Sequence, residues 1–276
     1  MAAHDAFTAA MATAGLAMHK GTPEGDGSLH RYRVADDKPG SLNGWYVLHL
    51  DGLPFGAFGS WKTGQSLSWH QEADQPMSDA ERRSLAARMA AAKAARDAEQ
   101  AKVQVATRER ASKLWNRAKP ANNAHPYLVR KQVGAFGIRE LGGRLVIPLR
   151  DTDGTLHSLQ FINGEGDKRF ISGGRKRGCY CAIGRPADVL CIAEGYATAA
   201  TIYQATGHAT AAAFDAGNLE PVAIALRHKF PRLTLLIAAD NDEATEGNPG
   251  LTYATKAARA VGAAIALPEF GEVANV

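Results

Sequence analysis

The stretch VLCIAEGYATAATI, residues 189–202, holds the features that decide the fold. A short apolar run reaches Ala193, and Glu194 and Gly195 then end it abruptly. Small residues compatible with a helix follow from Tyr196 onward. The stretch therefore predicts a buried strand, a sharp turn and a helix, with a carboxylate placed at the end of the strand.

The same alternation continues through residues 188–276. The runs HATAAAF (208–214), RLTLLIAAD (232–240) and AAIALPEF (263–270) are typical of buried strands, and helix-like segments separate them. Asn248 and Pro249 occupy the positions where an N-cap and the first residue of a helix are expected. Strands that alternate with helices predict an α/β domain, with a parallel sheet flanked by helices.

Acidic residues follow two of the predicted strands. Glu194 closes the first, and Asp240 and Asp242 follow the third in the sequence AADND. Because ligands of open α/β sheets bind beyond the carboxyl ends of the strands, the three carboxylates are candidate ligands for Mg²⁺ or Mn²⁺. Taken singly, Glu194 could be an acid stabilised by the helix dipole, and each Asp could simply begin a loop.

Three segments precede this domain. Residues 1–77 are predicted to form a small β-rich N-terminal domain, and residues 78–119 a helical connector that Ser78 and Glu81 open as a capping box. Residues 120–187 are predicted to form a basic α+β subdomain. It contains a short helix in HPYLVRKQV (125–133), a hairpin turning at DTDG (151–154) and a strand in KRFISG (168–173).

Aromatic residues are concentrated in the N-terminal domain. We expect them to form the core of its sheet, because aromatic residues in strands usually pack against one another. The alternative function for them is a stacking platform for single-stranded nucleic acid. The residues concerned are Trp45, Tyr46, Phe55, Phe58, Trp61 and Trp69.

Charge is distributed unevenly along the chain, although the net charge is only +4. Residues 119–187 carry 12 Lys and Arg against 5 Asp and Glu, whereas residues 188–276 carry 5 against 10. A basic segment beside an acidic one indicates a polyanionic partner held next to a cation site, although a charged run is often only a solvated face. The densest basic run comprises Lys168, Arg169, Arg175, Lys176 and Arg177.

The three cysteines are Cys179, Cys181 and Cys191. Their odd number and C-x-C spacing suit a reducing cytoplasm and predict buried thiols rather than a disulfide framework or a four-cysteine zinc site. No apolar run approaches the roughly 20 residues that a membrane span needs, so no membrane partner is expected.

The motifs of this chain resemble a known family. IAEG followed by a small-residue helix, together with a strand ending in ADND, resembles the Toprim domain of primases, topoisomerases and some nucleases. Upstream, HPYLVRKQV, LVIPLRDTDGTLHSLQFI and KRFISGGRKRG are similar to DNA primases of the plasmid and phage type, which are often fused to helicases.

This resemblance implies a DNA primase core, a nucleotidyltransferase that makes short RNA primers on single-stranded DNA. It implies that Glu194, Asp240 and Asp242 are the catalytic metal ligands, with Mg²⁺ or Mn²⁺ as cofactor. The implied partners are the template, ribonucleoside triphosphates and a replicative helicase. No zinc is expected, because the cysteine set of a zinc-binding module is missing. The implied nucleic-acid-binding residues are the basic run together with Arg130, Lys131 and Arg144.

Two alternatives stay open at this point. A Toprim nuclease would use the same metal to hydrolyse nucleic acid, and a non-catalytic module would only bind single-stranded DNA. His125 is expected to cap a helix or form a local hydrogen bond rather than act as a base.

Overall fold

The computed structural model describes residues 3–61, 63, 65–71, 78–240 and 248–267, in two compact units. Residues 1–100 form one unit and residues 101–276 the other. The predicted basic subdomain and the predicted C-terminal domain both fall within the second unit, and the four-part division itself stays a prediction. Among the described residues, none of the helices combines the length and hydropathy that a membrane crossing requires.

The first unit packs one helix against an antiparallel sheet. Helix α1 spans Ala3–Thr13, and the strands are β1 His30–Tyr32, β2 Gly44–His49, β3 Phe55–Ser60 and β4 Ser66–His70, in the order β1-β2-β3-β4. Phe7 of α1 is fully buried, and its ring contacts those of Tyr46 and Phe58 edge to face. The helix therefore covers the face of the sheet that carries these aromatic rings.

The predicted aromatic core is confirmed for most of its members. Trp45, Tyr46, Phe55 and Phe58 are buried. Trp61 differs, because its side chain is 43% exposed while its ring lies 5.8 Å from that of Trp45. These contacts support packing as the main role of the group.

Helix α2, Asp79–Arg117, runs from the first unit into the second. Its start is the predicted capping box, in which Ser78 N–H donates to Glu81 Oε2 at 2.8 Å and Glu81 N–H donates to Ser78 Oγ at 3.3 Å. Most of its side chains are exposed, as a connecting helix requires. Near its end, Ala111 is buried against the sheet that follows.

That sheet contains five antiparallel strands in the order β5-β6-β7-β8-β9. Their bounds are β5 Lys119–Pro120, β6 Arg139–Leu141, β7 Arg144–Arg150, β8 Leu156–Ile162 and β9 Lys168–Phe170. The short helix α3, Pro126–Lys131, precedes β6, and His125 caps it by accepting a hydrogen bond from Tyr127 N–H. The predicted hairpin is β7 and β8.

The C-terminal sheet has the strand order β10-β12-β11-β13-β14. Its strands are β10 Cys181–Ile183, β11 Val189–Ala193, β12 Ala209–Ala212, β13 Thr234–Ala238 and β14 Ala264–Ala266. Helices α4 Tyr196–Thr206, α5 Leu219–Lys229 and α6 Pro249–Val261 connect them, and a 3₁₀ turn, η1 Ala216–Asn218, precedes α5. Four strands are mutually parallel and β10 is antiparallel, which confirms the predicted α/β class.

The edge strand β10 was not predicted. It comes from residues assigned to the basic subdomain, and three residues are too few to show an alternating pattern. The capped start of α6 is as predicted, since Asn248 Oδ1 accepts a hydrogen bond from Leu251 N–H and Pro249 follows it.

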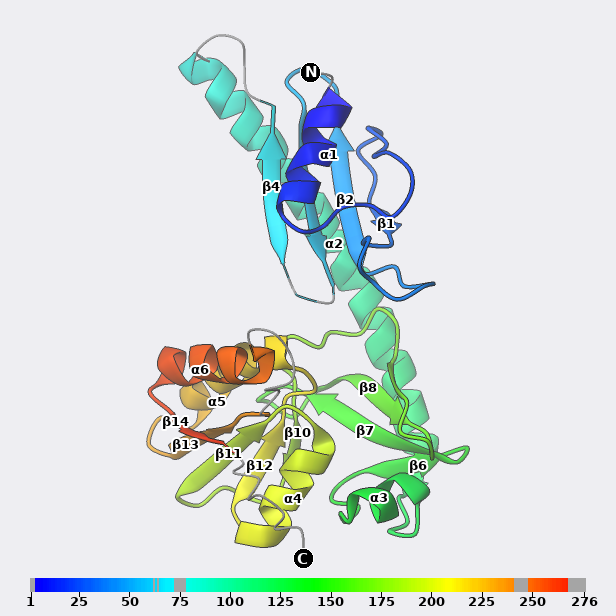
Figure 1. The fold of residues 1–276 in the computed structure, drawn as a ribbon, viewed down its shortest axis with the longest axis vertical. Coiled ribbons are helices and arrows are strands. Elements are labelled where there is room, and N and C mark those ends of the chain that lie inside the picture. Colours follow the sequence, from blue (N-terminus) through cyan, green and yellow to red (C-terminus); the bar gives the residue numbers. More distant parts are fainter. Residues whose placement is uncertain (1–2, 62, 64, 72–77, 241–247, 268–276) are drawn as a thin grey trace, which may run out of the picture. The chain divides into compact units, whose positions relative to one another are not determined.

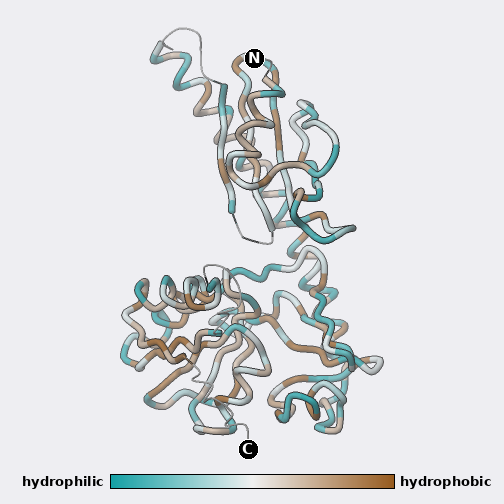
Figure 2. The backbone as a smooth tube through the Cα atoms, viewed as in Figure 1, coloured by the Kyte–Doolittle hydropathy of each residue, from teal (hydrophilic) through white to brown (hydrophobic). Residues whose placement is uncertain are grey.

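The parallel sheet is covered on both faces (Figure 1). Ile192, Ala211 and Ile237 pack against α5 and α6. The alternate residues Ala193 and Ala212 pack against α4 and against the strands of the preceding sheet. Figure 2 shows hydrophobic segments along these strands, as burial on both faces requires. One core thus joins the basic segment to the C-terminal sheet.

Candidate functional site

Strands β12, β11 and β13 lie side by side and end at the same edge of the sheet. Ala193 of β11 is opposite Ala212 of β12 and Ala238 of β13. Glu194 follows Ala193 directly, and Asp240 comes two residues after Ala238. The two carboxylates therefore lie on neighbouring strand ends, and both are half-buried.

The chemistry of this edge fits a divalent cation. Carboxylate oxygens are hard ligands of the kind that Mg²⁺ and Mn²⁺ take, with positions left for phosphate and water. Asp242, the third predicted ligand, lies outside the described residues. Asp215 is another acid near the edge, three residues beyond Ala212, but it forms an ion pair with Lys176. Glu194 and Asp240 are thus the described carboxylates of this edge that could hold a metal, and we call the edge that they mark the acidic edge.

A cation from the other sheet lies close to the turn that follows Glu194. Gly195 is the N-cap of α4, and Ala199 N–H donates to its carbonyl at 3.0 Å. The Lys168 ammonium lies 3.9 Å from the point that a Cβ atom on Gly195 would occupy. Lys168 belongs to β9 of the other sheet. The basic run therefore reaches the acidic edge at Lys168.

Asn218 attaches the remainder of the basic run to the sheet. This side chain is only 3% exposed. Its Oδ1 accepts from Gly178 N–H at 2.8 Å, and its Nδ2 donates to the carbonyls of Lys176, Cys179 and Ala213 at 2.8 to 3.2 Å. Because Ala213 follows β12 directly, the loop that carries Lys176 is fixed beside the strand end.

An aromatic pair lies at the same strand end. The ring centroids of Phe170 and Phe214 are 5.9 Å apart with an interplanar angle of 75°. Phe214 has φ of 77°, in the left-handed region that bulky residues rarely adopt. The Lys176 ammonium lies 5.4 Å from the centroid of the Phe170 ring.

Arg175 lies in a different environment from Lys176. Its Nη1 is 3.9 Å from Oδ2 of Asp151, and His157 Nε2 contacts the same oxygen at 2.6 Å. Burial by itself would raise the pKa of the Asp151 carboxyl. The contact with His157 and hydrogen bonds from the Thr155 and Asp153 N–H groups outweigh burial and hold the pKa below its ordinary value of 3.8.

The other predicted cations lie around the sheet that carries Lys168. Register pairs Leu145 with Ile162 and Ile162 with Lys168, so Arg144, which precedes Leu145, is at the same sheet end as Lys168. Arg130 of α3 donates to the Gly164 carbonyl at 3.0 Å in the turn that leads to β9.

Three further members of the predicted set, Lys131, Arg169 and Arg177, are exposed. Lys131 lies at the end of α3. Arg169 and Arg177 complete the run, on β9 and on the loop held by Asn218 respectively. The structure thus brings Lys168 and Lys176 to the acidic edge, and it places Arg175 against Asp151 instead.

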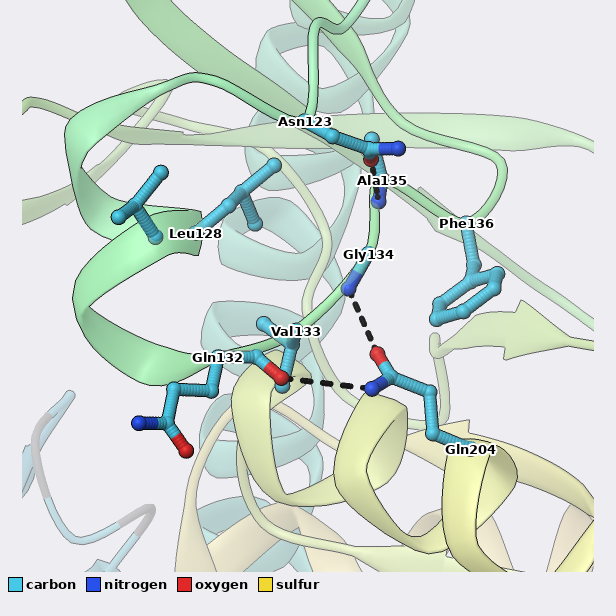
Figure 3. A pocket seen from close by; sticks show the side chains of 9 residues that line it. Asn123, Leu128, Gln132, Val133, Gly134, Ala135, Phe136 and Gln204 are labelled. Carbon is cyan, nitrogen blue, oxygen red and sulfur yellow. Dashed lines mark hydrogen bonds between the residues drawn. The ribbon is translucent and has the colours of Figure 1, made fainter.

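A pocket of about 450 Å³ lies between α3, the segment 132–136 and α4 (Figure 3). Gln204 of α4 accepts from Gly134 N–H at 2.6 Å and donates to the Gln132 carbonyl at 3.3 Å. The Tyr196 hydroxyl also contacts this segment: it accepts a hydrogen bond from Phe136 N–H at 2.7 Å and donates one to the Gly134 carbonyl at 2.8 Å. These bonds join the basic segment to the helix that follows Glu194.

The first unit contains a polar cluster that the sequence did not indicate. Ligand atoms of Glu24, Asp26 and His30 lie within 4.8 Å of one another. Asp26 Oδ1 contacts His30 Nε2 at 2.9 Å and accepts from Ser28 N–H at 2.8 Å. A local turn with an ion pair accounts for this arrangement.

Sequence reasoning missed several residues of the acidic edge. Asp215 and Asn218 follow the strand-like run HATAAAF, and an acid directly after a strand was the signal that could have identified Asp215. Asn218 gave no such signal, because its role depends on carbonyls from residues 176, 179 and 213 that only the fold brings together.

Comparison with known proteins agrees with this geometry. Residues 189–272 match the Toprim domain family. The whole chain is 39% identical over 292 residues to an Escherichia coli protein named DNA primase TraC, of which it covers 20%. A second Escherichia coli protein of the same name is 39% identical over 285 residues, with 98% of this chain and 27% of that protein covered. The chain thus spans about a fifth to a quarter of the length of these relatives.

Solved structures show a partial likeness. The primase fragment of the bacteriophage T7 primase-helicase protein covers 52% of this chain, with 64% of that fragment matched, 14% identity and a TM-score of 0.41. The DnaG primase catalytic domain bound to single-stranded DNA covers 63% of this chain, with 76% of that domain matched, 13% identity and a TM-score of 0.40.

Proposed function

We propose that this chain, whose residues 189–272 match the Toprim domain family, is the nucleotidyl-transfer core of a DNA primase. The observation that carries the proposal is the meeting of Glu194, Asp240 and Lys168 at one edge of the parallel sheet. Identity of 39% along the whole chain to a protein named DNA primase supports it.

In the proposed reaction, the 3′-hydroxyl of a ribonucleotide attacks the α-phosphate of a nucleoside triphosphate on a single-stranded DNA template. The hydroxyl loses its proton to water, and its oxygen forms a new bond to the α-phosphorus. The bond from that phosphorus to the oxygen that bridges to the β-phosphate breaks, and pyrophosphate leaves. Bound Mg²⁺ or Mn²⁺ would favour ionisation of the attacking hydroxyl and neutralise charge on the departing pyrophosphate.

Different residues of the chain would bind the metal and the phosphates. Glu194 and Asp240, with Asp242 beyond the described part, would supply the carboxylate oxygens that hold the metal. The Lys168 ammonium would neutralise a phosphate beside Gly195, where the first N–H groups of α4 also favour an anion. Template phosphates would be held by the other predicted cations: Arg130, Lys131, Arg144, Arg169, Arg175 and Arg177.

The proposal is tested with single-stranded template, Mg²⁺ and labelled ribonucleotides. Wild type should give labelled oligoribonucleotides, and Glu194→Gln and Asp240→Asn should abolish synthesis while template binding survives. Asp188→Asn is the matched control, because Asp188 is exposed at the opposite end of β11. Wild-type synthesis by Asp240→Asn would overturn the assignment. Template fragments made without nucleotides would indicate a Toprim nuclease, and binding alone a non-catalytic module.

The basic residues are tested separately by charge reversal. Changing Arg130, Arg144 and Arg169 together to Glu should weaken binding of single-stranded DNA and reduce the dependence of affinity on salt. An unchanged salt slope would show that these cations are only solvated surface.

A further inference from the structure

Phe170 is an exposed aromatic ring in the most basic part of the chain. Its side chain is 39% exposed at the end of β9. Lys168 and Phe170 are two residues apart on the strand, so they point to the same face of the sheet. Because the Lys168 ammonium lies beside Gly195, that face leads to the acidic edge.

The ring of Phe214, which follows β12, contacts the ring of Phe170 edge to face. The two rings meet at 75°. A positive φ at a bulky residue such as Phe214 persists only where the surroundings enforce it. They do so here, since Ala213 N–H donates to the Ala193 carbonyl at 2.8 Å and the Ala213 carbonyl accepts from Asn218. Phe214 is therefore a fixed support one strand away from Glu194.

Cations border the exposed ring. Lys176 lies over it at 5.4 Å while its ammonium pairs with Asp215, and Arg169 is its exposed neighbour on the strand. A flat apolar surface bordered by positive charge matches a nucleotide, which offers a flat base and an anionic phosphate. A purely acidic or purely apolar partner would match only one of these two features.

We propose that Phe170, supported by Phe214, is a stacking site for a nucleobase beside the acidic edge. Lys168 would hold the phosphate of that nucleotide or of its neighbour. The base would come from the single-stranded template or from a nucleoside triphosphate, and the two sources share the same chemistry. This inference deepens the proposed function and rests on it for the identity of the reaction.

The test compares Phe170→Ala and Phe170→Trp with wild type. Ile224→Ala is the matched control, because Ile224 on α5 is also 39% exposed. Binding is measured in two arms, one with oligothymidylate and one with ATP and Mg²⁺. Phe170→Ala should weaken binding in the arm that supplies the base by about 5- to 150-fold, the range expected for loss of one stacked base. Phe170→Trp should restore it, with quenching of the added tryptophan fluorescence.

An abasic oligonucleotide of the same length separates stacking from phosphate attraction. Phe170→Ala and wild type should bind it equally. Equal loss on the abasic strand, or equal affinities of Phe170→Ala and Ile224→Ala in both arms, would overturn the inference.

These binding arms do not depend on catalysis. A protein that makes no primers but loses base binding on Phe170→Ala would overturn the primase proposal and keep the stacking site. If the protein makes primers and Phe170→Ala changes binding in neither arm, the stacking site is overturned and the primase proposal is kept.

Discussion

Replacing Tyr196 by Phe removes one oxygen atom from the junction between the basic segment and the Toprim domain. That hydroxyl is the partner of both Phe136 N–H and the Gly134 carbonyl, at 2.7 and 2.8 Å, and Tyr196 is only 1% exposed. Loss of one partner of a buried hydrogen bond costs about 1–3 kcal/mol. Because both backbone groups sit in a partly accessible loop, we expect about 2 kcal/mol in total.

Amide hydrogen exchange at Phe136 measures this cost directly. A loss of about 2 kcal/mol corresponds to roughly 30-fold faster exchange if local opening controls the rate. Tyr203→Phe is the matched control, since Tyr203 lies on the same helix and its hydroxyl has no hydrogen bond to any described residue. If Phe136 exchanges equally fast in the two variants, the Tyr196 hydroxyl does not hold the junction.

Three further predictions concern buried polar groups. Burial raises the pKa of Cys179 to about 11 and that of Cys181 to about 12, so a thiol reagent at pH 8 should label the native protein negligibly and all three cysteines after unfolding. Asp151→Asn should make the free energy of unfolding fall less steeply as the pH is lowered into the acid range. The lowered pKa of Asp151 gives stability above its unfolded value of 3.8 that is lost as pH falls through the folded value, and identical acid limbs in urea titrations would refute this. Asn218→Ala should destabilise the second unit by about 3 kcal/mol through four lost hydrogen bonds, whereas an unchanged urea midpoint would contradict the anchoring role.

The parallel sheet could be predicted from sequence because its strands are buried on both faces. Such strands are continuous apolar runs, and VLCIA (189–193) and TLLIA (234–238) became β11 and β13. The acids at their ends could be found for the same reason, since a charge directly after such a run is conspicuous. The metal-ligand role of Glu194, Asp240 and Asp242 stays a prediction, and Asp242 lies outside the described residues.

What could not be predicted depends on contacts between distant segments. The strand Cys181–Ile183 is defined only by pairing with β12, and Asn218 acts through carbonyls about 40 residues upstream in the chain. The basic run reads as one uniform patch in sequence. The structure separates it, because Lys168 reaches Gly195 and Arg175 lies against Asp151.

At the acidic edge, different kinds of residue follow the two strands that flank β11. Glu194 ends the central strand, with β13 on one side and β12 on the other. Asp240 follows β13, whereas Phe214 and the Lys176–Asp215 ion pair follow β12. Asp240 therefore lies on the β13 side, whereas on the β12 side the Asp215 carboxylate is paired with Lys176 near the Phe170 and Phe214 rings. In the proposed reaction, a metal ion held by the carboxylates would itself screen them from the phosphates, and a further cation would reduce the negative charge that remains. Lys168, which comes from the other sheet and lies beside Gly195, is our candidate for that cation, and the shared core joins its sheet to the C-terminal sheet.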